Sequence, residues 1–106
     1  CLYCVVALGA ILRVRAKNPT IADQVAINFR KAEISNRQMA MLEFAEKVSN
    51  DSASINETDF QKLHAQGFTD EDIWDIAGIT AFFGLSNRMA NLTDMQPNIQ
   101  FYRMGR

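Results

Sequence analysis

Apolar residues recur at helical spacing along most of this sequence, whereas the two-residue alternation typical of a strand is weak throughout. Residues that start and stop helices divide the pattern into five segments. We therefore predict an all-α chain with helices at about 1–17, 19–29, 35–49, 58–66 and 70–92. Its 106 residues are enough for one small domain, and we expect a single helical domain over 1–106.

Several helix boundaries carry recognisable capping residues. Asn18 and Pro19 fit the N-cap and the first position of the second helix, because proline is favoured at a first helical position. Gly67 fits the position just after the fourth helix, where the backbone often turns left-handed.

Two helix starts have the spacing of a capping box, in which two side chains bond to each other's unpaired backbone amides. Ser35 and Gln38 have this spacing before the third helix, and Thr58 and Gln61 have it before the fourth. We therefore expect both pairs to fix the start of a helix.

The predicted helix at 70–92 is the longest, and it is apolar over most of its surface. Such a helix lies either at the centre of a protein or against another subunit. Trp74, Phe82 and Phe83 form an aromatic stripe along it, which we interpret as packing rather than as a cofactor site. We expect no cofactor.

Charge and hydropathy limit the classes of partner. A formal net charge of −1 argues against nucleic-acid binding. No stretch reaches the ~18 apolar residues of a membrane span. Residues 5–12 are apolar enough for a signal peptide, but the positive segment that should precede them is missing. We therefore expect a cytoplasmic protein that binds neither nucleic acid nor membrane.

The two cysteines of the chain, Cys1 and Cys4, lie three residues apart at the start of the first predicted helix. Positions i and i+3 share a helix face, so the two sulfurs are expected close enough to form a disulfide. The amides of a first helical turn stabilise a thiolate, which is the form that attacks a peroxide or a disulfide. A redox-active dithiol is the favoured interpretation, and two buried neighbouring cysteines are the alternative.

The residues around this dithiol are poor in proton donors. Leu8 lies one turn after Cys4 on the same face, where a histidine would act as a base. His64 is the one histidine, and we interpret it as a surface or cap residue rather than a catalytic one. Two cysteines and one histidine are also too few for structural zinc, which takes four ligands, so no metal is expected.

Five segments resemble one protein family: 1–6 (CLYCVV), 9–13 (GAILR), 22–26 (ADQVA), 68–76 (FTDEDIWDI) and 82–90 (FFGLSNRMA). They resemble the alkylhydroperoxidase D-like proteins of the carboxymuconolactone decarboxylase superfamily, in the branch of uncharacterised peroxidase-related enzymes. The resemblance covers nearly all of the chain. Since the sequence starts without Met and at once with apolar residues, we also expect it to be an N-terminally truncated form of that helical domain.

The resemblance implies an all-helical bundle, assembled as a dimer, trimer or hexamer, that reduces hydroperoxides through its dithiol. By the family pattern, Cys4 attacks the peroxide and Cys1 resolves the product, both on an active-site helix at about 1–17. Electrons would come from a thioredoxin-like or lipoyl-type dithiol donor.

The sequence departs from this family pattern at Leu8, which stands in place of a histidine, and the stretch that would carry a relay glutamate lies before Cys1. We therefore predict a thiol-dependent peroxidase-like enzyme whose turnover is impaired by Leu8. One alternative is a non-catalytic oligomeric helical protein with a redox-sensitive disulfide. A lactone decarboxylase ranks lower, because it needs a general acid or base that is not visible near Leu8.

Overall fold

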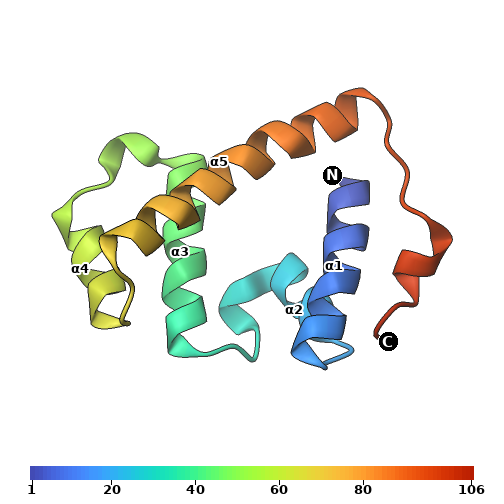
Figure 1. Cartoon of the computed structure of the whole chain (residues 1–106), viewed down its shortest axis with the longest axis horizontal. Helices are drawn as coiled ribbons and strands as arrows, with labels where there is room; N and C mark the ends of the chain where they lie inside the picture. The colour runs from blue at the N-terminus through green and yellow to red at the C-terminus, as the bar shows by residue number, and fades with distance from the viewer. The chain divides into compact units, whose positions relative to one another are not determined.

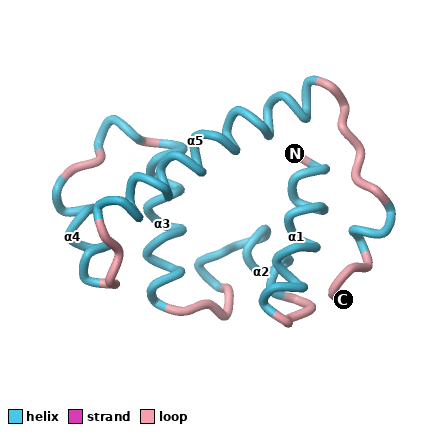
Figure 2. The backbone as a smooth tube through the Cα atoms, in the orientation of Figure 1, coloured by secondary structure: helices cyan, strands magenta, loops and turns pink.

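The computed structural model describes residues 1–106 and contains helices and turns but no strand (Figures 1 and 2). The predicted all-α class is therefore confirmed. The five α-helices are α1 Leu2–Ala16, α2 Ile21–Asn28, α3 Asn36–Asn50, α4 Glu57–Ala65 and α5 Asp70–Leu92. Short 3-10 helices form at η1 Phe29–Lys31, η2 Ser52–Ser54 and η3 Ile99–Tyr102.

The residues group into two compact units. The first unit contains Cys1–Glu33 together with Ser86–Arg106, so it combines both ends of the sequence. The second unit contains Ile34–Leu85. Helix α5 contributes its first part to the second unit and its last residues to the first.

The core of the second unit is built by one buried side chain from each of four segments: Phe44, Leu63, Phe68 and Ile73. Leu63 is only 1% exposed, and Phe60 extends the core by an edge-to-face contact with Phe44, with ring centroids 6.4 Å apart. Aromatic pairs of this geometry stabilise a core beyond the area that they bury. The unit therefore has its own hydrophobic centre.

The predicted capping box before α3 is confirmed. A capping box also precedes α4, but it is formed by other residues than the predicted Thr58 and Gln61. Ser35 Oγ accepts from the amide of Gln38, and Gln38 Oε1 accepts from the amide of Ser35. In α4 the cap is Asn56, whose Oδ1 accepts from the amide of Thr58 at 2.9 Å. Asp59 completes that box, because its Oδ2 accepts from the amide of Asn56 at 3.0 Å. Thr58 is thus already inside the helix.

Helix α2 begins later than the sequence predicts, at Ile21 rather than Pro19. Asn18 does act on the local backbone, because its Oδ1 accepts from the amide of Thr20 at 3.0 Å. That bond folds Asn18, Pro19 and Thr20 into a turn, and Thr20 becomes the N-cap. The helix therefore starts only after this turn.

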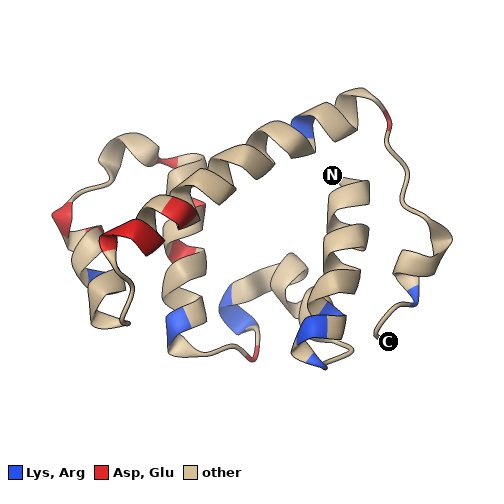
Figure 3. Ribbon diagram, in the orientation of Figure 1, with Lys and Arg blue, Asp and Glu red and all other residues tan.

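Helix α5 has an acidic first turn, visible in Figure 3, that suits the positive end of the helix dipole. Thr69 caps it, since Thr69 Oγ1 accepts from the amide of Asp72 and Asp72 Oδ2 accepts from the amide of Thr69. Hydrogen bonds to Thr69 lower the pKa of Asp72 below its usual range.

The apolar surface of α5 is only partly covered in this chain. Ile73 is 2% exposed, whereas the next residue, Trp74, is 81% exposed. Phe82 and Leu85 are also largely exposed. The aromatic stripe therefore does not form the core of the chain, and its packing against a partner subunit stays a prediction. None of the helices is both long and apolar enough to cross a membrane.

Candidate functional site

Cys1 and Cys4 are joined by a disulfide at the N-terminal end of α1, with their Cα atoms 5.3 Å apart. This separation is within the range that a disulfide normally spans. Cys1 is the N-cap of the helix, and Cys4 lies in its first turn. The structure therefore brings together the two sulfurs that the sequence singles out, in their oxidised form.

The two sulfurs have different surroundings. The amide of Cys4 donates to Cys1 Sγ at 3.2 Å, so the sulfur of Cys1 takes the place that an oxygen acceptor holds in most N-caps. Cys4 is 9% exposed, whereas Cys1 is more accessible. A negative charge on Cys1 would thus be stabilised by a backbone amide and the positive helix end, while burial disfavours a charge on Cys4.

Leu8 lies one turn after Cys4 in α1 and is 41% exposed. Its side chain can neither accept nor donate a proton. Because it is partly exposed, solvent reaches the helix surface at this position. Any proton that the dithiol takes up or releases on this side must therefore be exchanged with water or with a group other than residue 8.

His64 takes part in a separate interaction, in the second unit. Its Nε2 lies 2.6 Å from Oδ1 of Asp70, and its ring contacts Phe60 edge to face. The pair joins the last turn of α4 to the first turn of α5, and both side chains are largely solvent-exposed. This agrees with the interpretation of His64 as a surface residue at a helix end.

Arg13 is a buried cation that the sequence reasoning missed. It is 3% exposed and belongs to the buried side of α1, which also carries Cys4, Ala7 and Ala10. Its Nη2 donates to the carbonyl of Phe101 at 2.7 Å, and its Nε donates to the carbonyl of Met104 at 2.8 Å. The guanidinium therefore fastens the C-terminal segment 99–106 to α1.

A second contact fastens the same segment to α2. Arg106 and Asp23 form an ion pair with two hydrogen bonds, at 2.5 Å and 3.3 Å. The hydrogen bond from Arg106 holds the pKa of Asp23 below its usual range, and Asp23 raises that of Arg106. Arg106 also donates to the carbonyl of Tyr102. Two arginines thus hold the C-terminal segment against the two N-terminal helices.

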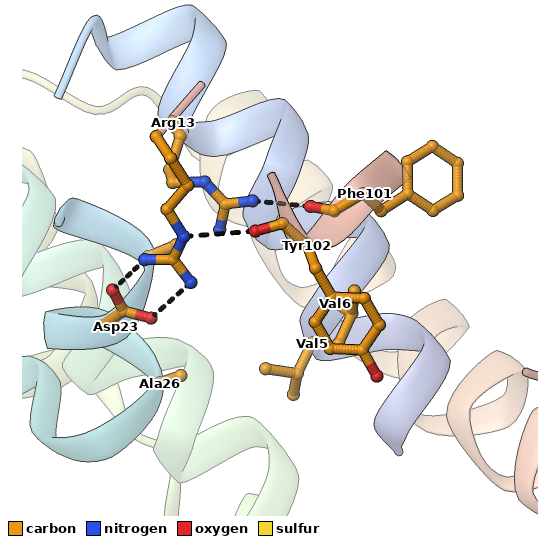
Figure 4. A pocket seen from close by; sticks show the side chains of 9 residues that line it. Val5, Val6, Arg13, Asp23, Ala26, Phe101 and Tyr102 are labelled. Atoms are coloured by element: carbon orange, nitrogen blue, oxygen red, sulfur yellow. Dashed lines mark hydrogen bonds and ion pairs between the residues drawn. The ribbon is translucent and has the colours of Figure 1, made fainter. Parts of the chain in front are cut away.

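These contacts border a cavity of about 140 Å³ within the first unit (Figure 4), which is open to solvent on the side where Val5 and Tyr102 are exposed. Its apolar wall comes from α1, α2 and η3, and its charged groups are Arg13, Asp23 and Arg106. The apolar lining residues are Val5, Val6, Ala22, Ala26, Phe101 and Tyr102. The cavity therefore combines an apolar wall with a cationic side.

No family model matches the chain, and no curated protein does. Solved structures do. An alkylhydroperoxidase AhpD core, an uncharacterized peroxidase-related protein from Ralstonia eutropha JMP134, superposes with a TM-score of 0.98 at 64% sequence identity. An uncharacterized peroxidase-related protein from Silicibacter sp. TM1040 superposes with a TM-score of 0.96 at 42% identity. Both matches cover 100% of this chain.

Over its whole length the chain is similar to alkylhydroperoxidase D-like proteins. Both similar structures are uncharacterised peroxidase-related proteins, which supports the branch that the sequence resemblance predicts. The chain spans 56% of the length of each of those two structures.

The alkylhydroperoxidase D-like dithiol was visible in the sequence, whereas the cavity beside it along α1 was not. Arg13 and Phe101 are separated by 88 residues, and Arg106 and Asp23 by 83, so no local pattern joins them. One signal was present: Arg13 continues the three-residue spacing of Cys4, Ala7 and Ala10 as the only charged member. A charged residue on a helix face of small apolar residues is expected to be buried, and a buried charge needs hydrogen-bond partners.

Proposed function

We propose that the protein reduces hydroperoxides through the Cys1–Cys4 dithiol, with Cys4 as the peroxide-attacking thiolate and Cys1 as the resolving thiol. The observation that carries the proposal is the pairing of the two sulfurs at the N-terminal end of α1, in a fold shared with peroxidase-related proteins. The division of roles between the two cysteines rests on the family resemblance. The amide bond to Cys1 stabilises a thiolate on the proposed resolving residue, which also reacts as a thiolate.

The reaction has three steps. The Cys4 thiolate attacks the terminal oxygen of the hydroperoxide, so that an S–O bond forms, the O–O bond breaks and an alcohol leaves with a proton from water. The Cys1 thiolate then attacks the sulfenic sulfur of Cys4, forming the disulfide and releasing hydroxide, which is protonated to water. A dithiol donor finally returns two electrons by thiol–disulfide exchange.

Leu8 makes the first step the slow one. The side chain of Leu8 can neither take the proton of Cys4 nor protonate the leaving alkoxide, so solvent must do both. The second step is less affected, because Cys1 has its own hydrogen-bond donor. We therefore propose a peroxidase in which attack on the hydroperoxide limits turnover.

Consumption of cumene hydroperoxide with dithiothreitol as the dithiol donor tests this proposal. We expect turnover by the wild type, loss of turnover in Cys4→Ser, and a trapped sulfenic acid in Cys1→Ser after one equivalent of peroxide. Sulfenic acid in Cys4→Ser instead would reverse the two roles. Equal consumption by the wild type and the variant lacking both cysteines would refute dithiol chemistry.

A non-catalytic protein with a redox-sensitive disulfide is the second candidate, and Leu8 is the observation that favours it. In that case the disulfide forms or is reduced according to the redox potential of the surrounding thiols, but the protein does not consume peroxide catalytically. Disulfide formation in a glutathione buffer without hydroperoxide turnover would support this candidate over the first.

The partners are part of the proposal. A thioredoxin-like or lipoyl-type protein is the proposed donor, and a cytoplasmic homo-oligomer is the proposed form. The exposed apolar side chains of α5, among them Trp74, Phe82 and Leu85, support association between copies, because large exposed apolar patches are typical of interfaces. Light scattering after gel filtration gives the subunit number, and a monomer at all concentrations would contradict this part.

A further inference from the structure

Arg13 has hydrogen-bond donors that the chain does not use. Its Nε and Nη2 donate to backbone carbonyls of the C-terminal segment, whereas its Nη1 donates no hydrogen bond within the chain. A Cβ built on Gly9 would lie 3.5 Å from Nη1, so this end of the guanidinium lies beside Gly9 of the same helix. Arg13 as a whole is 3% exposed, and its remaining donor can bond to water or to a bound group.

The space beside this guanidinium is large enough for a small organic molecule. The cavity that Arg13 lines measures about 140 Å³. An apolar cavity of ~150 Å³ engineered in another protein holds benzene, so about six heavy atoms fit a volume of this size. Figure 4 shows Val5, Val6 and Tyr102 among the side chains that surround it.

The charges on the cavity wall favour an anion. Three charged residues line it, and Asp23 is already held by two hydrogen bonds from Arg106. Two arginines and one aspartate therefore leave the cavity wall with one net positive charge. The apolar wall opposite disfavours a fully hydrated anion such as phosphate, because burying it would cost its hydration without replacing it.

We propose that this cavity is a binding site for a short-chain monocarboxylate. The carboxylate accepts hydrogen bonds from Nη1 of Arg13, and the alkyl chain lies against the wall formed by Val5, Val6 and the ring of Tyr102. Arginine suits this role because its planar N–H groups match a carboxylate and remain charged when buried.

The inference goes beyond the proposed peroxidase function, because neither cysteine lines the cavity. The wall of the cavity includes Val5, which directly follows Cys4 in α1, and its unpaired donor comes from Arg13 of the same helix. The carboxylate is thus a second ligand, bound where α1, α2 and the C-terminal segment meet.

Titration of the protein with butyrate, followed by the NMR shifts of methyl and aromatic protons, tests the site directly and needs no turnover. We expect saturable shifts at Val5, Val6 and Tyr102 with a Kd of roughly a millimolar, as suits a ligand with so few atoms. Butylamine has a similar alkyl chain with a positive charge, so it tests the selection of charge. Inorganic phosphate is an anion without an alkyl chain, so it tests the apolar contact. Neither is expected to give saturable shifts at these residues.

Variants distinguish binding of butyrate in the cavity from binding elsewhere on the protein surface. Ala26→Leu fills the cavity and leaves the Arg13 contacts in place, so we expect butyrate to bind at least tenfold more weakly. Ala65→Leu, on the exposed end of α4, is the matched control and should bind like the wild type. Arg13→Gln should abolish binding while Arg15→Gln, an exposed arginine of the same helix, should not.

Three results would overturn the proposal. One is the absence of saturable butyrate shifts up to about 50 mM, well above the expected range. Another is equal binding of butylamine and butyrate, which would show that Arg13 does not select the charge. The third is butyrate binding to Ala26→Leu that is as strong as binding to the wild type. That variant keeps the hydrogen bonds of Arg13, so a loss of binding in it does not come from a loss of those bonds.

Discussion

The backbone amide of Cys4 donates a hydrogen bond to the sulfur of Cys1, with 3.2 Å between the nitrogen and Sγ. The more accessible sulfur is therefore also the one that the helix end stabilises, whereas Cys4 is 9% exposed. In the proposed cycle this arrangement favours the second step, in which Cys1 must attack as a thiolate. It does little for the first step, which depends on Cys4.

This hydrogen bond predicts that Cys1 is reactive when it is the only cysteine. In Cys4→Ser the amide remains, so Cys1 should be alkylated by iodoacetamide at pH 7 roughly three- to tenfold faster than a cysteine in an unstructured peptide. The matched variant Cys1→Ser leaves the more buried Cys4, which should react more slowly than Cys1. Equal rates in the two variants would show that the helix end does not distinguish the sulfurs.

Introducing a base at position 8 should accelerate the proposed peroxidase. Leu8→His places an imidazole one turn after Cys4, and general acid–base catalysis contributes about 10²-fold or more when it is well positioned. We expect at least a tenfold gain in hydroperoxide consumption, with a rate that falls as pH drops below about 6.5 and the imidazole becomes protonated. Ile11→His, on an exposed position further along α1, is the control and should give no gain.

Alanine at two glycines should change stability in opposite directions. Gly105 has φ +77°, and a Cβ there would lie 2.8 Å from the Cβ of Arg13, so Gly105→Ala should destabilise the docked C-terminal segment by about 1–3 kcal/mol. Gly78 lies inside α5 with nothing within 4 Å of an added Cβ. Gly78→Ala should therefore stabilise the protein by about 0.5–1 kcal/mol through helix propensity. Urea unfolding measures both, and the same sign for both would contradict this account.

The ion pair between Asp23 and Arg106 predicts a pH dependence confined to acid. Arg106 holds the pKa of Asp23 below its ordinary value of 3.8, so the carboxylate is charged and paired at neutral pH. Because the folded-state pKa is the lower one, the stabilisation is complete above the ordinary value and is lost as pH falls through the folded pKa.

Asp23→Asn should accordingly lower the Tm slightly at pH 7, since both side chains are about half exposed and surface pairs contribute little. The difference from the wild type should disappear in acid. Asp75→Asn, an exposed aspartate of α5, is the control and should leave the Tm unchanged at both pH values. A Tm deficit for Asp23→Asn that persists at pH 2 would show that the effect is not electrostatic.

Local sequence was sufficient for features that depend on neighbouring residues. The box of Ser35 and Gln38 forms as expected, because each side chain needs only an amide three residues away. The same rule misplaced the start of α4, where Asn56 with Asp59 and Thr58 with Gln61 both have box spacing. Asn56 comes first in the chain, and once its side chain has bonded to the amide of Thr58, Thr58 is part of the helix.

Sequence by itself thus determined the helical class and the pairing of Cys1 with Cys4, which depend on periodicity or on spacings within one turn, and it showed the family resemblance through five short segments. Tertiary structure alone decided the partners of Arg13, since the carbonyls of Phe101 and Met104 lie 88 and 91 residues away in the chain. These contacts form because the C-terminal segment folds back against α1. Their acceptors are backbone carbonyls, which every residue has, so no residue type in the sequence indicates them. The cavity beside Arg13 exists only because of that return.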